Sequence, residues 1–143
     1  TQMLGNKIVA AFKYNNILYA SHVVAFVAFE LLKKQLDSPD IFTMLRTPEE
    51  DREIDFDIFK TNMKRAIDEL YMLNNRQQLK LAAHITTKEL SEIIDLGIEQ
   101  MSIYHPNLPL LRTKKGNITS EDLKLLYYYH NRMEGYGLQK HIG

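Results

Sequence analysis

The residues whose types could do chemistry gather in the segment 127–137, which reads Tyr-Tyr-Tyr-His-Asn-Arg-Met-Glu-Gly-Tyr-Gly. Its members His130, Arg132 and Glu134 form a candidate polar cluster. His130 and Glu134 stand four positions apart, so on a helix they share a face, and the carboxylate could orient the imidazole and favour its protonated form. Two interpretations stay open: an acid–base or ligand-contacting pair, or a helix docked by its tyrosine rings with these polar groups in surface or interhelical hydrogen bonds.

A second candidate lies in the most apolar stretch of the chain, residues 17–32, which contains His22 and Glu30. A carboxylate in apolar surroundings needs a cation or hydrogen-bond donors, and we expect Arg132 or a lysine of another element to supply them. His22 and Glu30 are therefore a candidate buried polar pair. The residue types favour a structural role for it, with a functional role as the alternative.

No known catalytic or ligand-binding motif accompanies these residues. The sequence has no glycine-rich phosphate loop, no nucleophile elbow and no His-Glu-x-x-His metal motif. It has no Cys, which excludes a disulfide framework, a zinc finger, an iron–sulfur site and a Cys nucleophile. The histidines are scattered rather than spaced as metal ligands: His22, His84, His105, His130 and His141. We therefore assign no catalytic residue, no cofactor and no metal.

The charge pattern bears on the class of partner. The chain has 18 Lys+Arg and 18 Asp+Glu, and residues 36–60 form an acidic belt between mildly basic ends. A net charge of zero argues against binding driven by the phosphates of nucleic acid or by an anionic membrane. No nucleic-acid partner is expected.

The elements that would position these residues are mainly helical. Residues 17–32 are apolar on every face, which predicts a helix covered all round, by this chain or by a partner. At about 24 Å that helix is short of the roughly 30 Å hydrocarbon core of a bilayer. The other predicted elements are a connector at 36–54 with helical turns after Ser38-Pro39 and Thr47-Pro48, an amphipathic helix at 55–75, a short strand at 79–83, a helix at 87–102, a hairpin at 108–119, and a last helix from 119–122 to Gly135 or Gly137.

Two details of these elements can be tested directly. Thr86 and Glu89 have capping-box spacing, which predicts that the 87–102 helix begins at Thr86. Gly97, inside that helix, predicts close packing against another element. The fold class is therefore mainly α with a small β-hairpin and about four main helices, in a single domain of residues 1–143 with 1–16 as a lead-in.

The order helix, helix, short strand, helix, hairpin also resembles a winged-helix layout, with Lys114 and Lys115 at the tip of the wing. The candidate recognition helix, however, would be repelled by the major groove, because it carries several acids: Glu89, Glu92, Asp95 and Glu99. A winged-helix-like module that binds protein or nucleic acid is the alternative function.

Two segments resemble a known family. Residues 14–26, which read Tyr-Asn-Asn-Ile-Leu-Tyr-Ala-Ser-His-Val-Val-Ala-Phe, and residues 127–137 are similar to the C-terminal region of bacterial glycerol-3-phosphate acyltransferases. The resemblance implies a parent protein that transfers an acyl chain to glycerol 3-phosphate or a related glycerolipid acceptor. It implies a cytoplasmic location, with the parent peripheral to the cytoplasmic membrane and this region following the catalytic domain.

The family's catalysis depends on a His-x-x-x-x-Asp motif, which this chain does not contain. The nearest approach is His84 with Glu89, so no catalytic residue is carried over. We expect a non-catalytic C-terminal accessory domain, inactive alone, that packs against and stabilises the catalytic acyltransferase domain. The 17–32 helix and the tyrosine-rich terminus would lie at that contact, and a membrane surface would be met only through the parent. A free-standing enzyme that uses His130 and Glu134 is a third hypothesis.

Overall fold

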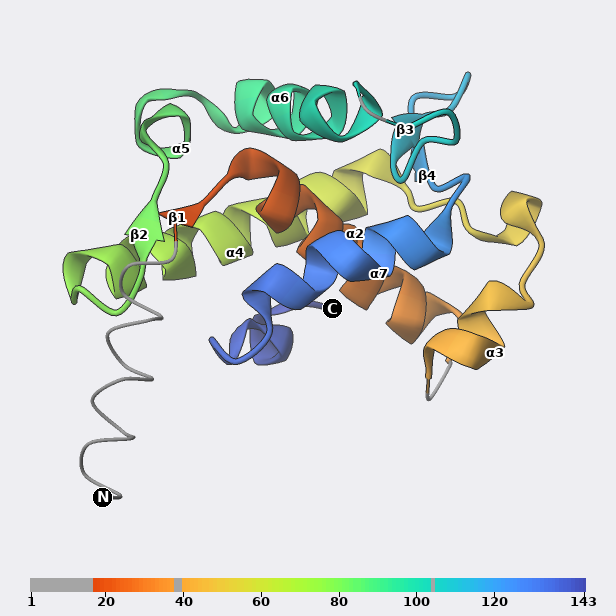
Figure 1. Cartoon of the computed structure of the whole chain (residues 1–143), viewed down its shortest axis with the longest axis horizontal. Helices are drawn as coiled ribbons and strands as arrows, with labels where there is room; N and C mark the ends of the chain where they lie inside the picture. Colours follow the sequence, from red (N-terminus) through yellow and green to blue (C-terminus); the bar gives the residue numbers. More distant parts are fainter. Residues whose placement is uncertain (1–16, 38–39, 104) are drawn as a thin grey trace.

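The structure is a computed structural model that describes residues 17–37, 40–103 and 105–143 (Figure 1). The expected mainly helical class is confirmed for these residues, and four of their six α-helices have eight residues or more. The helices are α2 (Ala20–Gln35), α3 (Ile41–Leu45), α4 (Phe56–Asn75), α5 (Ala83–Thr87), α6 (Leu90–Ser102) and α7 (Leu123–His130). Three 3-10 turns complete the helical part: η1 (Glu49–Asp51), η2 (Asn131–Met133) and η3 (Leu138–His141). The lead-in 1–16 lies outside the described residues.

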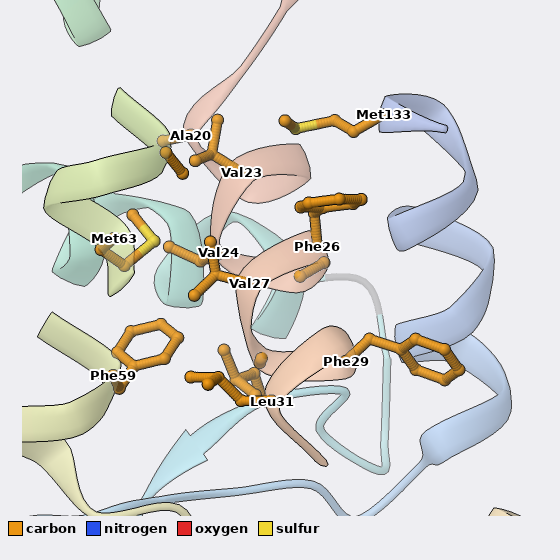
Figure 2. Packing of buried hydrophobic residues seen from close by; sticks show 14 of the residues in the cluster. Ala20, Val23, Val24, Phe26, Val27, Phe29, Leu31, Phe59, Met63 and Met133 are labelled. Atoms are coloured by element: carbon orange, nitrogen blue, oxygen red, sulfur yellow. The ribbon is translucent and has the colours of Figure 1, made fainter. Parts of the chain in front are cut away.

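Helix α2 is the centre of the molecule. Twelve of its sixteen residues are buried, because α4, α6 and α7 each pack along a different side of it. Figure 2 shows Phe26 and Phe29 pointing toward α7, while Val24 and Val27 point toward Phe59 and Met63 of α4. The prediction of a helix covered all round is confirmed, and the cover comes from this chain.

Helix α4 follows its sequence pattern closely. Its apolar residues recur at steps of three and four and form one buried stripe, whereas the other face is polar. The helix begins after Asp55, whose carboxylate accepts the N–H groups of Asp57 and Ile58 and so satisfies two otherwise unpaired donors. The predicted helix at 55–75 is confirmed.

Two short strand pairs tie the helices together. β1 (Ile17–Leu18) lies parallel to β2 (Lys80–Leu81), with Leu18 opposite Leu81. β3 (Leu111–Arg112) lies antiparallel to β4 (Ile118–Thr119). Gly116 in the connecting turn has φ of 85°, a conformation that glycine adopts without steric cost. The predicted hairpin is confirmed, and the predicted strand at 79–83 shortens to two residues before α5.

Two helix starts differ from their predictions. The apolar helix begins at Ala20 rather than at 17, because Ile17 and Leu18 pair with β2. The helix predicted from Thr86 begins only at Leu90, and Glu89 flanks it without a side-chain capping bond. Thr86 already belongs to α5 and donates its hydroxyl to the carbonyl of Ala83, so it is not free to cap the next helix.

The connector and the end of the last helix also depart from their predicted caps, whereas the last helix begins as predicted, after the capping residue Asp122. α3 is capped by Asp40, which accepts the N–H of Thr43 at 2.8 Å, while Ser38 and Pro39 lie outside the described residues. η1 follows Pro48 with no side-chain cap. α7 ends at His130, short of Gly135 and Gly137, because the chain tightens there into the 3-10 turn η2.

Gly97 allows α6 to approach α2 closely, as its position in the sequence predicted. A Cβ atom at residue 97 would lie 2.7 Å from the carbonyl oxygen of Ala20 and 2.7 Å from a methyl group of Val24. The first of these atoms belongs to the backbone, so it cannot move aside without displacing the start of α2. The approach of the two helices therefore requires glycine at this position.

Replacing Gly97 by alanine should destabilise the protein by about 1–3 kcal/mol, the usual range for overpacking, even though alanine is the better helix former. Thermal or urea unfolding measures the difference. The matched control is Ser91→Ala on the exposed face of α6, which should leave stability unchanged or slightly raised. Equal or higher stability of Gly97→Ala would contradict the close approach.

Candidate functional site

A hydrogen-bonded pair of ionisable side chains joins the two segments that the sequence singled out. Glu30 of α2 and His130 at the end of α7 meet at 2.8 Å between Oε1 and Nε2. Their side chains are only 7% and 2% exposed. The other ring nitrogen of His130 lies 3.3 Å from Oδ1 of Asn131. An oxygen thus faces each ring nitrogen.

Aromatic rings enclose this pair. The His130 ring lies parallel to Phe26, with 5.1 Å between ring centroids and 6° between planes, and its centroid is 4.5 Å from that of Phe29. Tyr127 stacks on it at 5.7 Å. The rings keep water away from the pair, so the attraction between carboxylate and imidazole acts in a medium of low dielectric constant. A substrate could not reach either group without opening the core.

The structure corrects both predicted groupings. The expectation that Arg132 or a lysine would serve Glu30 is wrong, because His130 does so. Glu30 does not pair with His22, and the two lie on the same helix more than two turns apart. His130 is separated from Arg132 and Glu134, which are exposed, because α7 ends at His130 and η2 turns the chain so that Met133 faces the core instead.

His22 and a histidine distant in the sequence, His84, close the N-terminus of α2. Nδ1 of His22 accepts the N–H of Tyr19, and Nε2 of His84 accepts the N–H of Ala20, both at 3.0 Å. These N–H groups belong to the end of a helix where donors lack intrahelical partners. The His84 ring also stacks on Tyr19, with 5.9 Å between centroids. Two imidazoles thus act as capping acceptors in the place usually taken by Glu, Gln, Ser or Asp.

Both imidazoles must be neutral to accept in this way, and their surroundings favour the neutral form. Burial, and then the positive charge of Arg132, lowers the pKa of His22 from 6.5 to about 4. Burial, and then the charge of Lys88, lowers the pKa of His84. Neutral imidazole carries one proton, so the nitrogen of each ring that does not accept is a donor.

A surface hollow of about 380 Å³ lies beside this helix start. Among the described residues its lining comes from α2, α7 and η2: His22, Tyr128, Tyr129, Asn131 and Arg132. Tyr128 is 73% exposed, and the Tyr129 hydroxyl lies 3.0 Å from Nε2 of His105. Arg132 has no carboxylate within salt-bridge distance in the part of the chain that the structure describes. The hollow therefore combines one unpaired cation with aromatic hydroxyls, an amide and an imidazole.

Sequence reasoning missed part of this arrangement. The contact of His84 with α2 could not be predicted from local sequence, because its partner, Ala20, lies 64 residues earlier. His22, in contrast, could have been recognised, since it stands three residues after Tyr19 where the second member of a capping box belongs. That signal was hidden because the helix was expected to begin at residue 17.

The hairpin presents a different surface from the basic wing of a DNA reader. Lys114 and Lys115 are exposed at its tip, but Arg112 is paired with Asp95 of α6 at 3.2 Å. Hydrogen bonds from Asn117 and Thr113 hold the pKa of Glu53 below its ordinary value, so that carboxylate stays charged beside the hairpin. The adjoining hollow of about 310 Å³ is lined mainly by acids, Glu49 and Glu50 among them. These acids offset the charge of the two lysines, which argues against a surface that attracts phosphate.

Comparisons with known proteins add no relative. None of the protein-family models matches the sequence, and no curated protein or solved structure matches it significantly. Within the described ranges, no three His, Asp or Glu side chains are grouped so as to hold a metal ion. No described helix has both the length and the apolar character needed to cross a bilayer.

Removing one partner of the Glu30–His130 pair should be strongly destabilising. His130→Leu leaves a carboxylate in an apolar core, and we expect a loss of about 3–5 kcal/mol in chemical unfolding. The double variant Glu30→Leu/His130→Leu buries no unpaired charge and should recover most of that loss. A double variant that is as unstable as the single one would contradict this account of the pair.

The capping role of His22 predicts a pH dependence. The folded state lowers the pKa of His22 to about 4, so its contribution to stability is fully present above pH 6.5 and is lost as the pH falls toward 4. Allowing for partial exposure, the loss is on the order of 2 kcal/mol. His22→Gln keeps an acceptor at the same capping position but does not titrate. Urea unfolding from pH 7 to 4 should therefore show a shallower fall for His22→Gln, and equal slopes would count against the capping role.

Proposed function

We propose that this chain is a non-catalytic helical accessory domain of a glycerophospholipid-synthesis acyltransferase, which packs against the catalytic domain and stabilises it. The parent would transfer an acyl chain to glycerol 3-phosphate or a related glycerolipid acceptor. The observation that carries the proposal is that the two segments with the family resemblance form one structural unit.

That unit is the contact of α2 with α7 and η2. Of the first segment, residues 17–26 are described, and they include the start of α2 and Phe26. The second segment contains His130, which stacks on Phe26 and bonds to Glu30 of the same helix. The two segments, about a hundred residues apart in the sequence, therefore meet directly in the buried contact of Phe26 with His130. This supports a common origin of both segments in one accessory domain.

A non-catalytic role is supported by what the imidazoles do. A general base on a glycerol hydroxyl needs a ring nitrogen with a free lone pair within reach of the substrate. The accepting nitrogens of His22 and His84 already bind backbone N–H groups of the α2 start. His130 is enclosed in the core. These rings maintain the fold, and their arrangement gives no reason to assign them acid–base work.

The surface of contact with the catalytic domain needs revision. Helix α2, expected at that contact, is covered by the chain's own helices and offers little to a partner. Of the two segments expected there, the tyrosine-rich one has the more exposed aromatic side chain, Tyr128 at 73%, whereas Tyr19 of the other segment is 42% exposed. We therefore place the contact, within this proposal, on the side of α7 that faces away from α2.

Acyl-transfer assays test the proposal. The purified chain should show no transfer from an acyl donor to glycerol 3-phosphate, because it does not contain the His-x-x-x-x-Asp motif. The protein encoded by the whole reading frame should show it and should contain a His-x-x-x-x-Asp sequence outside this chain. In that longer protein His130→Leu should lower the temperature at which activity is lost, while KM for glycerol 3-phosphate at low temperature stays unchanged.

Two outcomes would contradict the proposal. One is turnover by the chain alone that His84→Ala abolishes and His105→Ala preserves, since this would make His84 a base. The other is a whole reading frame that contains no acyltransferase motif and transfers no acyl chain.

A further inference from the structure

The hollow between the start of α2 and the end of α7 is a candidate anion site that the accessory role does not require. It is lined by His22, Tyr128, Tyr129, Asn131 and Arg132, and no described acid lines it. Its volume of about 380 Å³ falls within the range of small-molecule pockets. What it could bind depends on which hydrogen-bonding groups of the lining are unused.

The unused groups are mainly donors. Nδ1 of His22 accepts from the backbone of Tyr19, so the proton of the neutral ring is on Nε2. Oδ1 of Asn131 faces His130 at 3.3 Å, which leaves the amide NH₂ available. Arg132 has five N–H donors and no described carboxylate within salt-bridge distance. The first turn of α2 contains no acid, so the positive end of the helix dipole at this edge of the hollow is capped by neutral imidazoles and faces no carboxylate of that turn.

This donor set selects among anions. The donors come from two elements, His22 from α2 and both Asn131 and Arg132 from η2, and an oxyanion with three terminal oxygens offers them more acceptors than a planar carboxylate with two. The guanidinium can bind two phosphate oxygens side by side, and the imidazole and amide can take the third. The tyrosine rings provide apolar area for the group that carries the phosphate.

We infer that this hollow binds the phosphate group of a phosphate ester, with Arg132 as its charged ligand and His22 and Asn131 as neutral donors. The phosphate could belong to a small soluble ester or to a phospholipid headgroup. The inference does not depend on the acyltransferase proposal, because it rests on the lining of the hollow alone.

The test is a titration of the full chain, followed by NMR, with inorganic phosphate as the probe. Phosphate should shift the signals of the Arg132 side chain and the His22 ring with a dissociation constant in the millimolar range. It should also raise the pKa of His22 from about 4, because a nearby negative charge favours the imidazolium. Arg132→Gln should weaken binding about tenfold or more, as expected for a lost charge-assisted hydrogen bond.

Arg76→Gln is the matched control, because Arg76 is also exposed but does not line the hollow. This variant should bind phosphate like the wild type. Sedimentation with vesicles distinguishes a soluble ester from a phospholipid headgroup as the source of the phosphate. One set of vesicles contains phosphatidylcholine alone, and the other contains phosphatidylcholine mixed with phosphatidic acid. Binding of inorganic phosphate without vesicle binding supports a soluble ester, and vesicle binding that needs both phosphatidic acid and Arg132 supports a headgroup.

Three outcomes would overturn the inference. The first is no response to phosphate or to phosphatidic acid vesicles. The second is an equal response in Arg132→Gln, with the variant's unfolding temperature unchanged. The third is acetate shifting the same signals as strongly as phosphate, since this would remove the preference for three oxygens.

Discussion

The hydrogen bond between Glu30 and His130 is the constraint on which the rest of the fold depends. A helix as apolar as α2 can be buried on all sides only if its one carboxylate is satisfied inside the core. His130 does this from α7, and the ring it brings also fills the space between Phe26 and Phe29. One side chain therefore gives the buried carboxylate a hydrogen-bond partner and also packs against the two phenylalanine rings. The position of α7 on α2 follows from that double requirement, because shifting α7 by a turn would separate the pair.

Much of the fold was predictable because the signals were local. The buried stripe of α4, the capping carboxylate Asp55 and the turn at Gly116 each follow from residues within a few positions of one another. Gly97 pointed to a close approach without revealing its target. Even the complete burial of α2 could be inferred from its composition, although the identity of the covering elements could not.

The candidate site was less predictable because its contacts are long-range. Glu30 and His130 were both singled out, but each was assigned a different partner, since spacing along a helix carries no information about the facing helix. Because Ile17 pairs with Lys80, α2 begins later than the sequence predicted. The hydrogen bond from Ala20 to His84 gives that imidazole a capping role at the helix start. The end of α7 at His130 then separated Arg132 from the histidine and placed it beside the hollow.

The parallel pairing of β1 with β2 also has a consequence for how the chain folds. The first turn of the central helix is completed by groups about sixty residues further along, so the loop between them must close before that turn is stable. Contacts of such separation slow folding relative to a bundle built from neighbouring helices. We expect α4, whose cap and stripe are local, to acquire structure first, and the start of α2 to be among the last parts to become ordered.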